Sequence, residues 1–279
     1  MSIKTTVITG ATSGIGKETA LALIKKDHAV YMLVRNTEKG EQLRQQLIKE
    51  TGNQAVFVIK CDLADLKSVR KAAAELKAKL FNINILINNA GGAYSEKELS
   101  KDGFEMTFTS NHLGHFLLTE SLMPLLQKGH ARIINVSSES HRSASPNFDD
   151  LEWEHTPYKT LKAYGISKLY NIYFTKSLAE KYSQTGITAY ALHPGVVSTS
   201  IWEGVKGFGK ILVWFFKRFM ITPEEGAKTS IFLATEPKLE TKSGLYFKKC
   251  KVVETSKKAN DTAARNQLWD ISKQTTTGF

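Results

Sequence analysis

Tyr164 and Lys168 stand four residues apart in a stretch with helical patterning, so their side chains share one face of the predicted helix. A phenol has a pKa near ~10, and bringing it to about 7 takes about 4 kcal/mol of phenolate stabilisation. One ammonium about 4 Å away, at an effective dielectric of about 20, supplies a similar amount. The pair therefore predicts proton transfer by Tyr164, assisted by Lys168. A tyrosine and a lysine at this spacing are also common as an ordinary surface pair, so the prediction depends on neighbouring motifs.

A glycine-rich stretch at residues 9–16, Thr-Gly-Ala-Thr-Ser-Gly-Ile-Gly, lies between the first predicted strand and the first predicted helix. Glycines let backbone amides approach a pyrophosphate, and the positive end of the helix dipole points at the phosphates. Many turns resemble such a stretch, but a strand before it and a helix after it indicate dinucleotide binding. The contacts expected from this loop are Gly10, Thr12, Ser13, Gly14, Ile15 and Gly16.

The second predicted strand, residues 29–34, ends in Arg35 and Asn36. A site that prefers NAD places a carboxylate near this point to bind the ribose 2′-hydroxyl. Arg35 offers instead a planar donor fork for a 2′-phosphate and a flat face for adenine. We therefore expect NADP(H) rather than NAD(H), the alternative being a plain surface arginine at a strand end.

Two further strands end in residues suited to the same carboxyl edge, where doubly wound sheets bind ligands. Residues 133–136 run into Ser137 and Ser138, and a serine there could donate to a substrate oxygen as it gains charge. Residues 87–91 read Ile-Asn-Asn-Ala-Gly, polar and then small, which suits close approach of a cofactor. Both features predict that the active site lies at this edge.

Short β-branched runs alternate with longer amphipathic segments, which predicts right-handed βαβ units and a doubly wound parallel sheet with helices on both faces. No linker, repeat or low-complexity tract interrupts the pattern, so residues 1–279 are predicted to form a single α/β domain. The predicted strands are 3–8, 29–34, 55–59, 83–88, 131–136 and 187–192. The predicted helices are 15–26, 38–50, 66–79, 103–127 and 161–183, with a C-terminal extension at 248–279 that ends in a short helix.

The chain of 279 residues carries a formal net charge of +11, and 42% of its residues are hydrophobic. The charge permits attraction to anionic cofactors, membranes or nucleic acid, but a solvated surface explains it more simply. No stacking aromatics accompany the C-terminal lysines, so no nucleic acid is expected. Two cysteines are too few for a disulfide framework, and neither a signal peptide nor a spanning apolar run is present. We therefore expect a cytoplasmic protein.

The order of these motifs along the chain closely resembles that of the short-chain dehydrogenase/reductase family, whose members have a Rossmann-type fold. Each motif is weak alone, but the combination is specific and spans nearly the whole chain. The resemblance implies an NADP-dependent alcohol dehydrogenase or carbonyl reductase. The matching pieces are residues 9–16, residues 88–91, Asn111, Ser138, the pair Tyr164 and Lys168, and residues 193–199, His-Pro-Gly-Val-Val-Ser-Thr.

The resemblance also implies a role for each catalytic residue. Tyr164 would be the general acid in reduction and the general base in oxidation, while Lys168 would lower its pKa and hold the nicotinamide ribose. Ser138, rather than Ser137, matches the serine of the family and would position the substrate oxygen. Asn111 would bend its helix and hold a water that relays protons to Lys168.

Further cofactor contacts follow from the same resemblance. Asp62 would bind the adenine amino group, while Val197 and Thr199 would hold the carboxamide. The other contacts that it implies are Leu63, Asn89, Ala90, Gly91, Pro194 and Gly195, together with Tyr164 and Lys168.

Residues 12–20, 137–141, 147–159 and 263–270 resemble the retinol dehydrogenase-like branch of the family. That branch commonly acts on lipophilic aldehydes and alcohols with NADP(H), so we expect an oxidoreductase that interconverts a lipophilic aldehyde or ketone and its alcohol. The alternative is a non-catalytic NADP(H)-binding regulatory or scaffold protein, which would have no need of a low-pKa phenol. The resemblance also implies a homo-oligomer, a dimer or tetramer paired through the two longest predicted helices.

Residues 200–222 break the alternation and carry aromatic side chains among lysines. The segment could be a helix packed on the core, a substrate lid, or an interfacial helix with its apolar side chains in a membrane. We predict a lid, which implies a bulky apolar substrate, with peripheral membrane contact as an additional role. His112 and His115 have no third ligand at metal spacing, so no metal is expected.

Overall fold

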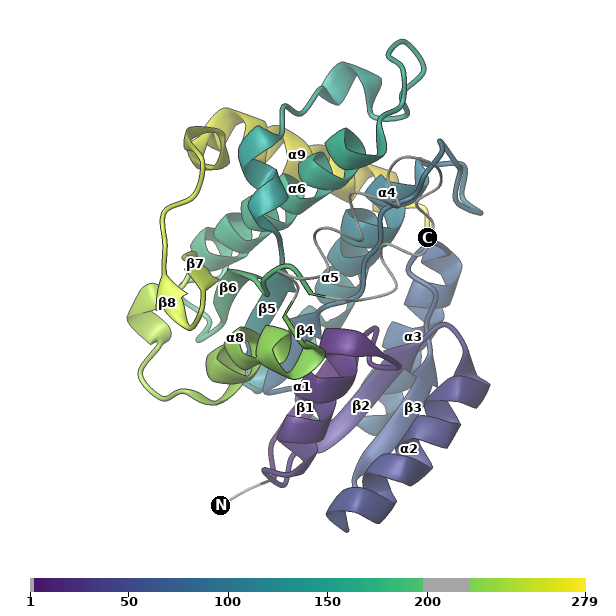
Figure 1. Cartoon of the computed structure of the whole chain (residues 1–279), viewed down its shortest axis with the longest axis vertical. Coiled ribbons are helices and arrows are strands. Elements are labelled where there is room, and N and C mark those ends of the chain that lie inside the picture. The colour runs from purple at the N-terminus through teal and green to yellow at the C-terminus, as the bar shows by residue number, and fades with distance from the viewer. Residues whose placement is uncertain (1–2, 198–220) are drawn as a thin grey trace.

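A computed structural model describes residues 3–197 and 221–279, and within these residues eight strands form one central sheet with helices on both faces (Figure 1). The strand order is β3-β2-β1-β4-β5-β6-β7-β8, and all neighbours are parallel except the antiparallel pair β7 and β8. The strands are β1 (Thr5–Thr9), β2 (Ala29–Val34), β3 (Val56–Lys60), β4 (Ile85–Asn88), β5 (Arg132–Val136), β6 (Thr188–His193), β7 (Tyr246–Lys248) and β8 (Lys251–Val252).

The central strands are apolar on both sides because both faces of the sheet are covered. In β1 and β4, Val7 pairs with Leu86 and Ile8 pairs with Ile87, and all four side chains are fully buried. Runs of this kind are typical of parallel sheets between two helical layers. Since the strands are parallel, their carboxyl ends meet at one edge of the sheet, where the functional side chains are expected.

Two helical layers enclose two separate hydrophobic clusters, one on each face of the sheet. One layer consists of α1 (Gly14–Ile24), α2 (Thr37–Thr51) and α8 (Pro223–Thr235). The other consists of α3 (Leu66–Lys79), α5 (Gly114–Lys128) and α6 (Thr160–Lys181), with α9 (Thr262–Thr276) packed outside it. Short helical turns complete the chain: α4 (Met106–Phe108), η1 (Thr109–Leu113), η2 (Glu139–Ser143), η3 (Phe148–Asp150), η5 (Glu240–Lys242) and η6 (Lys257–Asn260).

The predicted doubly wound α/β fold is confirmed, and the six predicted strands match observed strands to within one or two residues. One correction concerns the predicted helix at 103–127, which is divided into α4, the π-helical turn η1 and α5. A second is that the sheet is not wholly parallel, because the C-terminal extension adds the antiparallel strand β8. Helix α8 and strand β7 were not predicted. The predicted lid at 200–222 lies outside the described residues except for its last two.

Helix α9 covers part of the outer surface of α5 and α6. Trp269 packs edge-to-face on Phe116 at 5.1 Å between ring centroids and also contacts Phe174. His112 Nε2 lies 2.8 Å from the hydroxyl of Ser272. The helices through which we expect subunits to pair are thus partly covered by the same chain, and homo-oligomerisation stays a prediction.

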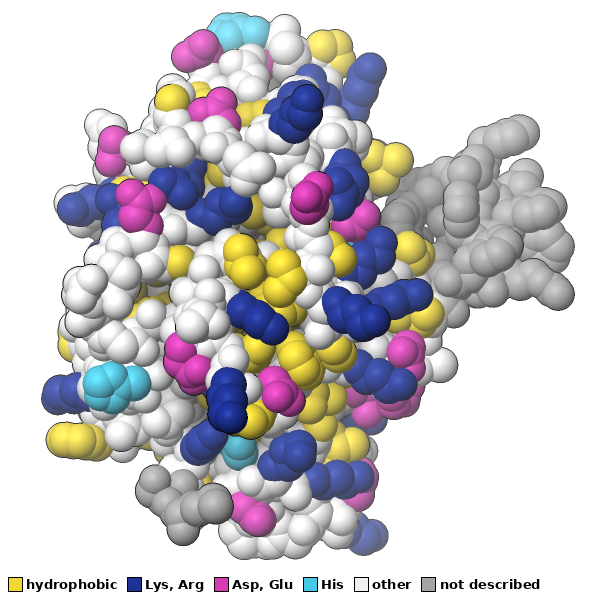
Figure 2. All heavy atoms as spheres, turned by 90° about the vertical axis from the view of Figure 1, so that its left-hand side faces the viewer, with side chains coloured by type: hydrophobic (Ala, Val, Ile, Leu, Met, Phe, Trp, Pro, Cys, Tyr) yellow, Lys and Arg dark blue, Asp and Glu magenta, His cyan; other side chains and the backbone are white. Residues whose placement is uncertain are grey.

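The positive charge is dispersed rather than concentrated on the face shown in Figure 2. Lys and Arg side chains there alternate with acidic and apolar ones. Several of the lysines of the protein are paired, as Lys228 is with Glu225 and Lys248 with Glu139. Such a distribution is typical of a solvated surface, where ion pairs contribute little to stability.

The two histidines around η1 make stability depend on pH. His112 and His115 are each 1% exposed, and burial lowers the pKa of each to about 3. The unfolded chain protonates its histidines near pH ~6.5, so below that pH the unfolded state binds more protons than the folded state. We expect each histidine to lower the free energy of unfolding by about 1.4 kcal/mol per pH unit in mildly acidic solution.

Urea unfolding of the wild type and of His112→Gln at pH 7.5, 6 and 5 measures this effect. The carboxyl groups are common to both proteins, so the difference between their slopes isolates His112. The variant should lose stability less steeply as the pH falls. Identical slopes would show that His112 is protonated in the folded protein.

Candidate active site

A cavity of about 880 Å³ runs along the carboxyl edge of the sheet. It extends from the glycine-rich loop after β1, past the ends of β2 and β3, to Tyr164 and Lys168 of α6. The volume of the cavity suits a dinucleotide. The glycine-rich loop could hold the pyrophosphate, and Tyr164 would then lie near the nicotinamide. The predicted cofactor contacts that line it are Gly10, Thr12, Ser13, Gly14, Ile15, Gly16, Arg35, Asp62, Leu63, Asn89, Ala90, Gly91, Tyr164, Lys168 and Pro194.

The phosphate loop needs glycine at particular positions. Gly10 and Gly14 have φ angles of +68° and +54°, in the left-handed region. A Cβ at Gly16 would lie 2.2 Å from the carbonyl oxygen of Gly10, so only glycine fits there. Ser13, the N-cap of α1, makes no side-chain hydrogen bond to the first amides of the helix. These amides are therefore available to an anion, which the helix dipole also attracts.

The hydroxyl of Thr9 joins the end of β1 to β4 and to α5. It accepts hydrogen bonds from the amides of Asn89 and Ala90, each at 3.0 Å, and lies 2.9 Å from His115 Nε2. The other ring nitrogen, Nδ1, lies 3.2 Å from the carbonyl oxygen of Asn111, which can only accept. His115 thus carries its proton on Nδ1 and accepts from Thr9 at Nε2. This role of His115 was not predicted, although His115 follows Asn111 at the i, i+4 spacing of a helix.

Asn111 lies in the π-helical turn η1 and is fully buried. Its amide nitrogen donates to the carbonyl of Gly92 and to the hydroxyl of Ser167, both at 2.9 Å. Its amide oxygen accepts from the backbone amide of Gly92. The expected helix irregularity is therefore present, and the side chain anchors the loop after β4. The water relay to Lys168 stays a prediction.

Helix α6 places Lys168 beside Tyr164, with Nζ 5.4 Å from the centre of the tyrosine ring. Nζ also donates to the carbonyl of Val136 at 3.2 Å, which ties the lysine to the end of β5. A Cβ at Gly91 would lie 3.1 Å from Nζ, so the loop after β4 passes close to the ammonium. The tyrosine, the lysine and the loop after β4 are therefore held together.

Burial opposes ionisation of both members of this pair. It raises the pKa of Tyr164 above its ordinary value, although a hydrogen bond from Ser138 acts in the opposite direction. Burial also lowers the pKa of Lys168 to about 8. The expectation that Lys168 brings the phenol towards pH 7 is therefore wrong for the protein alone. The physical reason is that Nζ lies over the ring and bonds to Val136, so its attraction does not offset the desolvation of the phenolate.

The two serines after β5 have different partners. The hydroxyl of Ser137 donates to the carbonyl of Lys168 at 2.7 Å and so joins β5 to α6. The hydroxyl of Ser138 donates to the hydroxyl of Ser140 at 3.3 Å and accepts from the amide of Ser140 at 3.2 Å, and it lowers the pKa of Tyr164. Ser137 lines the large cavity and Ser138 does not, so the assignment of Ser138 to the substrate oxygen stays a prediction from the family resemblance.

The far end of the cavity carries two basic side chains, Arg35 at the end of β2 and Lys39 in the first turn of α2. Asp62 is the one carboxylate among the described lining residues, and its Oδ1 accepts from the amide of Ala64 at 3.1 Å. The charge at this end is therefore positive near β2. Lys39 was not predicted, although a lysine four residues after Arg35 was visible in the sequence.

The loop after β6 is only partly described. Pro194 lines the cavity, whereas Gly195 and Val197 do not. Gly195 has a φ of +103°, and Val197 forms an isolated parallel bridge with Ile221. The predicted contact Thr199 lies outside the described residues.

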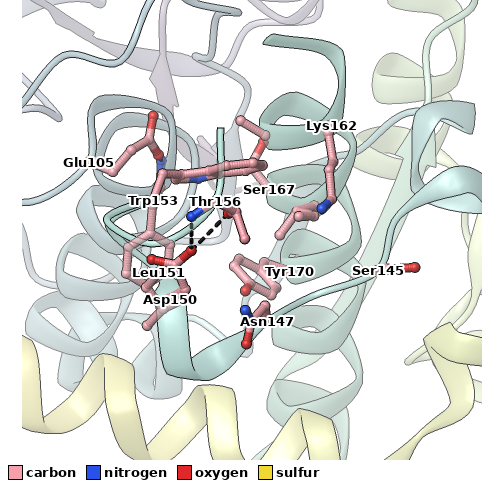
Figure 3. A pocket seen from close by; sticks show the side chains of 13 residues that line it. Glu105, Ser145, Asn147, Asp150, Leu151, Trp153, Thr156, Lys162, Ser167 and Tyr170 are labelled. Atoms are coloured by element: carbon pink, nitrogen blue, oxygen red, sulfur yellow. Dashed lines mark hydrogen bonds between the residues drawn. The ribbon is translucent and has the colours of Figure 1, made fainter. Parts of the chain in front are cut away.

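A second, much smaller cavity of about 40 Å³ lies beside α6, beneath residues 145–156 (Figure 3). The carboxylate of Asp150 accepts from the amide and the hydroxyl of Thr156 and so closes this loop on itself. The hydroxyl of Tyr170 is buried there without a protein partner. The cavity has room for a few water molecules at most, so it is no substrate site.

Two further findings concern metals and membranes. Within residues 3–197 and 221–279, no three His, Cys, Asp or Glu side chains are grouped as a metal site requires. No helix in the same residues combines the length and the apolar content needed to cross a bilayer.

Known proteins resemble this chain in both sequence and structure. A family model described as Enoyl-(Acyl carrier protein) reductase matches residues 10–239. The chain is 41% identical over 270 residues to retinol dehydrogenase 11 of Homo sapiens, covering 96% of this chain and 84% of that protein.

Two solved structures extend the comparison. An uncharacterized protein from Mycobacterium paratuberculosis superposes with a TM-score of 0.79 at 32% identity, over 98% of this chain and 93% of that one. A gluconate 5-dehydrogenase from Burkholderia cenocepacia, in complex with NADP and tartrate, gives a TM-score of 0.70 at 25% identity, over 88% and 93%. The sequence match over nearly the whole chain places this protein in the short-chain dehydrogenase/reductase family, as an oxidoreductase of the retinol dehydrogenase-like branch.

Proposed function

We propose that this oxidoreductase uses NADP(H) to interconvert a lipophilic aldehyde or ketone and its alcohol, with Tyr164 as the proton-transfer residue. The observation that carries the proposal is the single cavity that joins Arg35 to Tyr164 and Lys168. The effect of the Ser138 hydroxyl on Tyr164 also supports it, because that hydroxyl lowers the pKa of the phenol. A purely regulatory or scaffold protein would need neither hydroxyl.

The residues of the chain divide the work as follows. Bound NADPH supplies the hydride in reduction, and NADP accepts it in oxidation. Ser138 donates a hydrogen bond to the substrate oxygen, and Tyr164 gives that oxygen its proton in reduction. Lys168 holds a positive charge next to the tyrosine and would bind the nicotinamide ribose of the cofactor. Asn111 and His115 hold the loop after β4 against this group.

The preference for NADP(H) is supported by charge at the adenine end of the cavity. Arg35 and Lys39 both line that end, and a 2′-phosphate between them would meet two cations. The one carboxylate among the described lining residues, Asp62, follows β3, whereas the end of β2, where a site that prefers NAD places its carboxylate, carries Arg35. The gluconate 5-dehydrogenase similar to this chain was crystallised with NADP.

The preference for lipophilic substrates is supported by the relatives. Retinol dehydrogenase 11 is named for an alcohol with a long apolar body. Its match covers 96% of the length of the present chain. Residues 200–222, which we predict as the lid, carry aromatic side chains that would suit such a substrate. Contact of this segment with a membrane surface stays a further prediction.

Replacing Tyr164 tests the proposed chemistry. Tyr164→Phe removes the proton donor and should lower kcat by about 10²–10⁴-fold, with NADPH binding nearly unchanged. The rate is followed as NADPH oxidation over aldehydes and ketones of graded size and polarity. Tyr182→Phe is the matched control, since that hydroxyl bonds to Glu120 at the far end of α6. Retained activity in Tyr164→Phe, or a preference for small polar ketones, would contradict the proposal.

Replacing Arg35 tests the choice of cofactor. Arg35→Ala should weaken NADPH binding by about 10–150-fold, or about 1.5–3 kcal/mol, with little change for NADH. Titration of tryptophan fluorescence with each cofactor gives the two dissociation constants. Arg44→Ala, which removes an α2 arginine paired with Glu41, is the control and should change neither. An equal loss of affinity for NADPH and NADH would contradict the assignment of Arg35 to the 2′-phosphate.

The pH profile tests the charge on Lys168. Burial places its pKa at about 8, so the ammonium is present below that pH and is lost as the pH rises through it. Since kcat/KM for NADPH reports groups of the free enzyme, it should fall about tenfold per pH unit well above this value. A flat profile up to pH 10 would show that the lysine remains charged or is not needed.

A further inference from the structure

We propose that His141 is a positioning residue for Ser138, which it connects to the C-terminal segment of the chain. The imidazole is fully buried in the turn η2, immediately after Ser138. Its Nδ1 lies 2.7 Å from the carbonyl oxygen of Ser138, and its Nε2 lies 3.1 Å from the backbone amide of Ser256. The inference deepens the proposed function and rests on it, because it assumes that Ser138 meets the substrate.

The partners of the ring settle which nitrogen carries the proton. A carbonyl oxygen can only accept a hydrogen bond, so Nδ1 must donate to Ser138. A backbone amide can only donate, so Nε2 must be the unprotonated nitrogen that accepts from Ser256. Both ring nitrogens are thus satisfied by main-chain groups, and the neutral imidazole forms a bridge between two segments 115 residues apart.

The hydrogen bond from His141 fixes the main chain of Ser138, the residue proposed to bind the substrate oxygen. The Ser138 carbonyl accepts from the backbone amide of His141 at 3.1 Å as well as from the ring. On the other side of the turn, a Cβ at Gly165 would lie 2.8 Å from the carbonyl oxygen of Ser140. The turn therefore packs against α6 at Gly165, next to Tyr164. On the other side of the turn, His141 bonds to the carbonyl of its N-cap residue, Ser138.

The C-terminal segment that His141 reaches is itself anchored to the same region. Arg142 donates to the carbonyl of Glu254 at 2.6 Å, and Lys258 donates to the carbonyl of Ala144 at 3.1 Å. The hydroxyl of Tyr173 in α6 donates to the carbonyl of Lys258 at 2.8 Å. The C-terminal segment is thus anchored by several hydrogen bonds, and through the amide of Ser256 it fixes the position of His141 relative to Ser138.

The groups around the ring keep it neutral. Tyr246 packs edge-to-face on it at 5.1 Å, and the charged neighbours are Glu139 and Arg142, which pair with each other, and Lys248, which also pairs with Glu139. Burial, more than these charges, holds the pKa of His141 below its ordinary value. A proton on Nε2 would turn the acceptor into a donor facing the Ser256 amide, so neutrality preserves the bridge.

Three substitutions separate the two arms of the bridge. In His141→Asn the side-chain NH₂ can occupy the place of Nδ1 and keep the bond to Ser138. In His141→Gln the side-chain oxygen can occupy the place of Nε2 and keep only the bond to Ser256. His141→Phe keeps the ring volume and loses both bonds. His28→Asn is the control, since His28 is a buried histidine bonded to Thr6 at the opposite edge of the sheet.

If His141 positions Ser138, kcat for carbonyl reduction should fall about tenfold in His141→Gln and His141→Phe, and at most about twofold in His141→Asn. The KM for NADPH should not change in any of them. His28→Asn should lower Tm without changing kcat. Equal kcat in all His141 variants, or kcat that follows Tm across the whole set, would overturn the proposal.

A second measurement needs no turnover and separates failure of this inference from failure of the proposed function. The ¹³Cζ resonance of Tyr164, assigned with Tyr164→Phe, reports the pKa of the phenol in the cofactor-free protein. The Ser138 hydroxyl lowers the pKa of Tyr164, so displacing Ser138 should raise that pKa. The pKa should therefore be higher in His141→Gln and His141→Phe than in the wild type, and unchanged in His141→Asn. If the wild type reduced no carbonyl, the proposed function would fail while this titration still decided the role of His141. The same titration curve in all four proteins would exclude it.

Discussion

One buried hydroxyl, that of Thr9, joins the parts of the site that sequence keeps far apart. Its two acceptor positions are filled by the amides of Asn89 and Ala90, and its proton faces His115 Nε2 at 2.9 Å, with the carbonyl of Ile87 farther away at 3.4 Å. The histidine in turn bonds to the carbonyl of Asn111 within the π-helical turn. Every hydrogen-bonding capacity of the Thr9 side chain is therefore used, and moving any one of β1, β4 or α5 would leave a buried polar group unpaired.

Much of the fold could be predicted from the sequence because its signals are local. Apolar β-branched runs gave the six main strands, and helical periodicity gave most of the helices within two residues. The periodic pattern did not mark the π-helical turn, and an irregularity at Asn111 was expected only from the family resemblance. Helix α8 did carry a capping signal, with Thr222 accepting from the amide of Glu225 and a proline at the first turn, but Gly226 weakens its pattern. Strands β7 and β8 are too short for alternation to show.

The site divides in the same way between local and non-local information. Residues joined by short spacings, such as Tyr164 and Lys168, could be found from sequence, as could the glycines whose conformations the turn requires. His115 and His141 could not be assigned, because their partners Thr9 and Ser256 are more than a hundred residues away. A buried histidine that bridges two main-chain groups leaves no motif in the amino-acid sequence. Lys39 is a different case, because it follows Arg35 by only four residues and lies beside the cavity because α2 begins at Thr37.

Burial, rather than charge attraction, sets the resting state of the catalytic pair. A phenolate and an ammonium both lose hydration in this pocket, so the pKa of Tyr164 rises and that of Lys168 falls. At neutral pH the folded chain therefore holds the tyrosine as the acid, with a lysine still mostly protonated beside it. A protonated phenol can give a proton to a carbonyl oxygen. To accept one from an alcohol, the phenol must first lose its own proton, which burial opposes and nearby positive charge promotes.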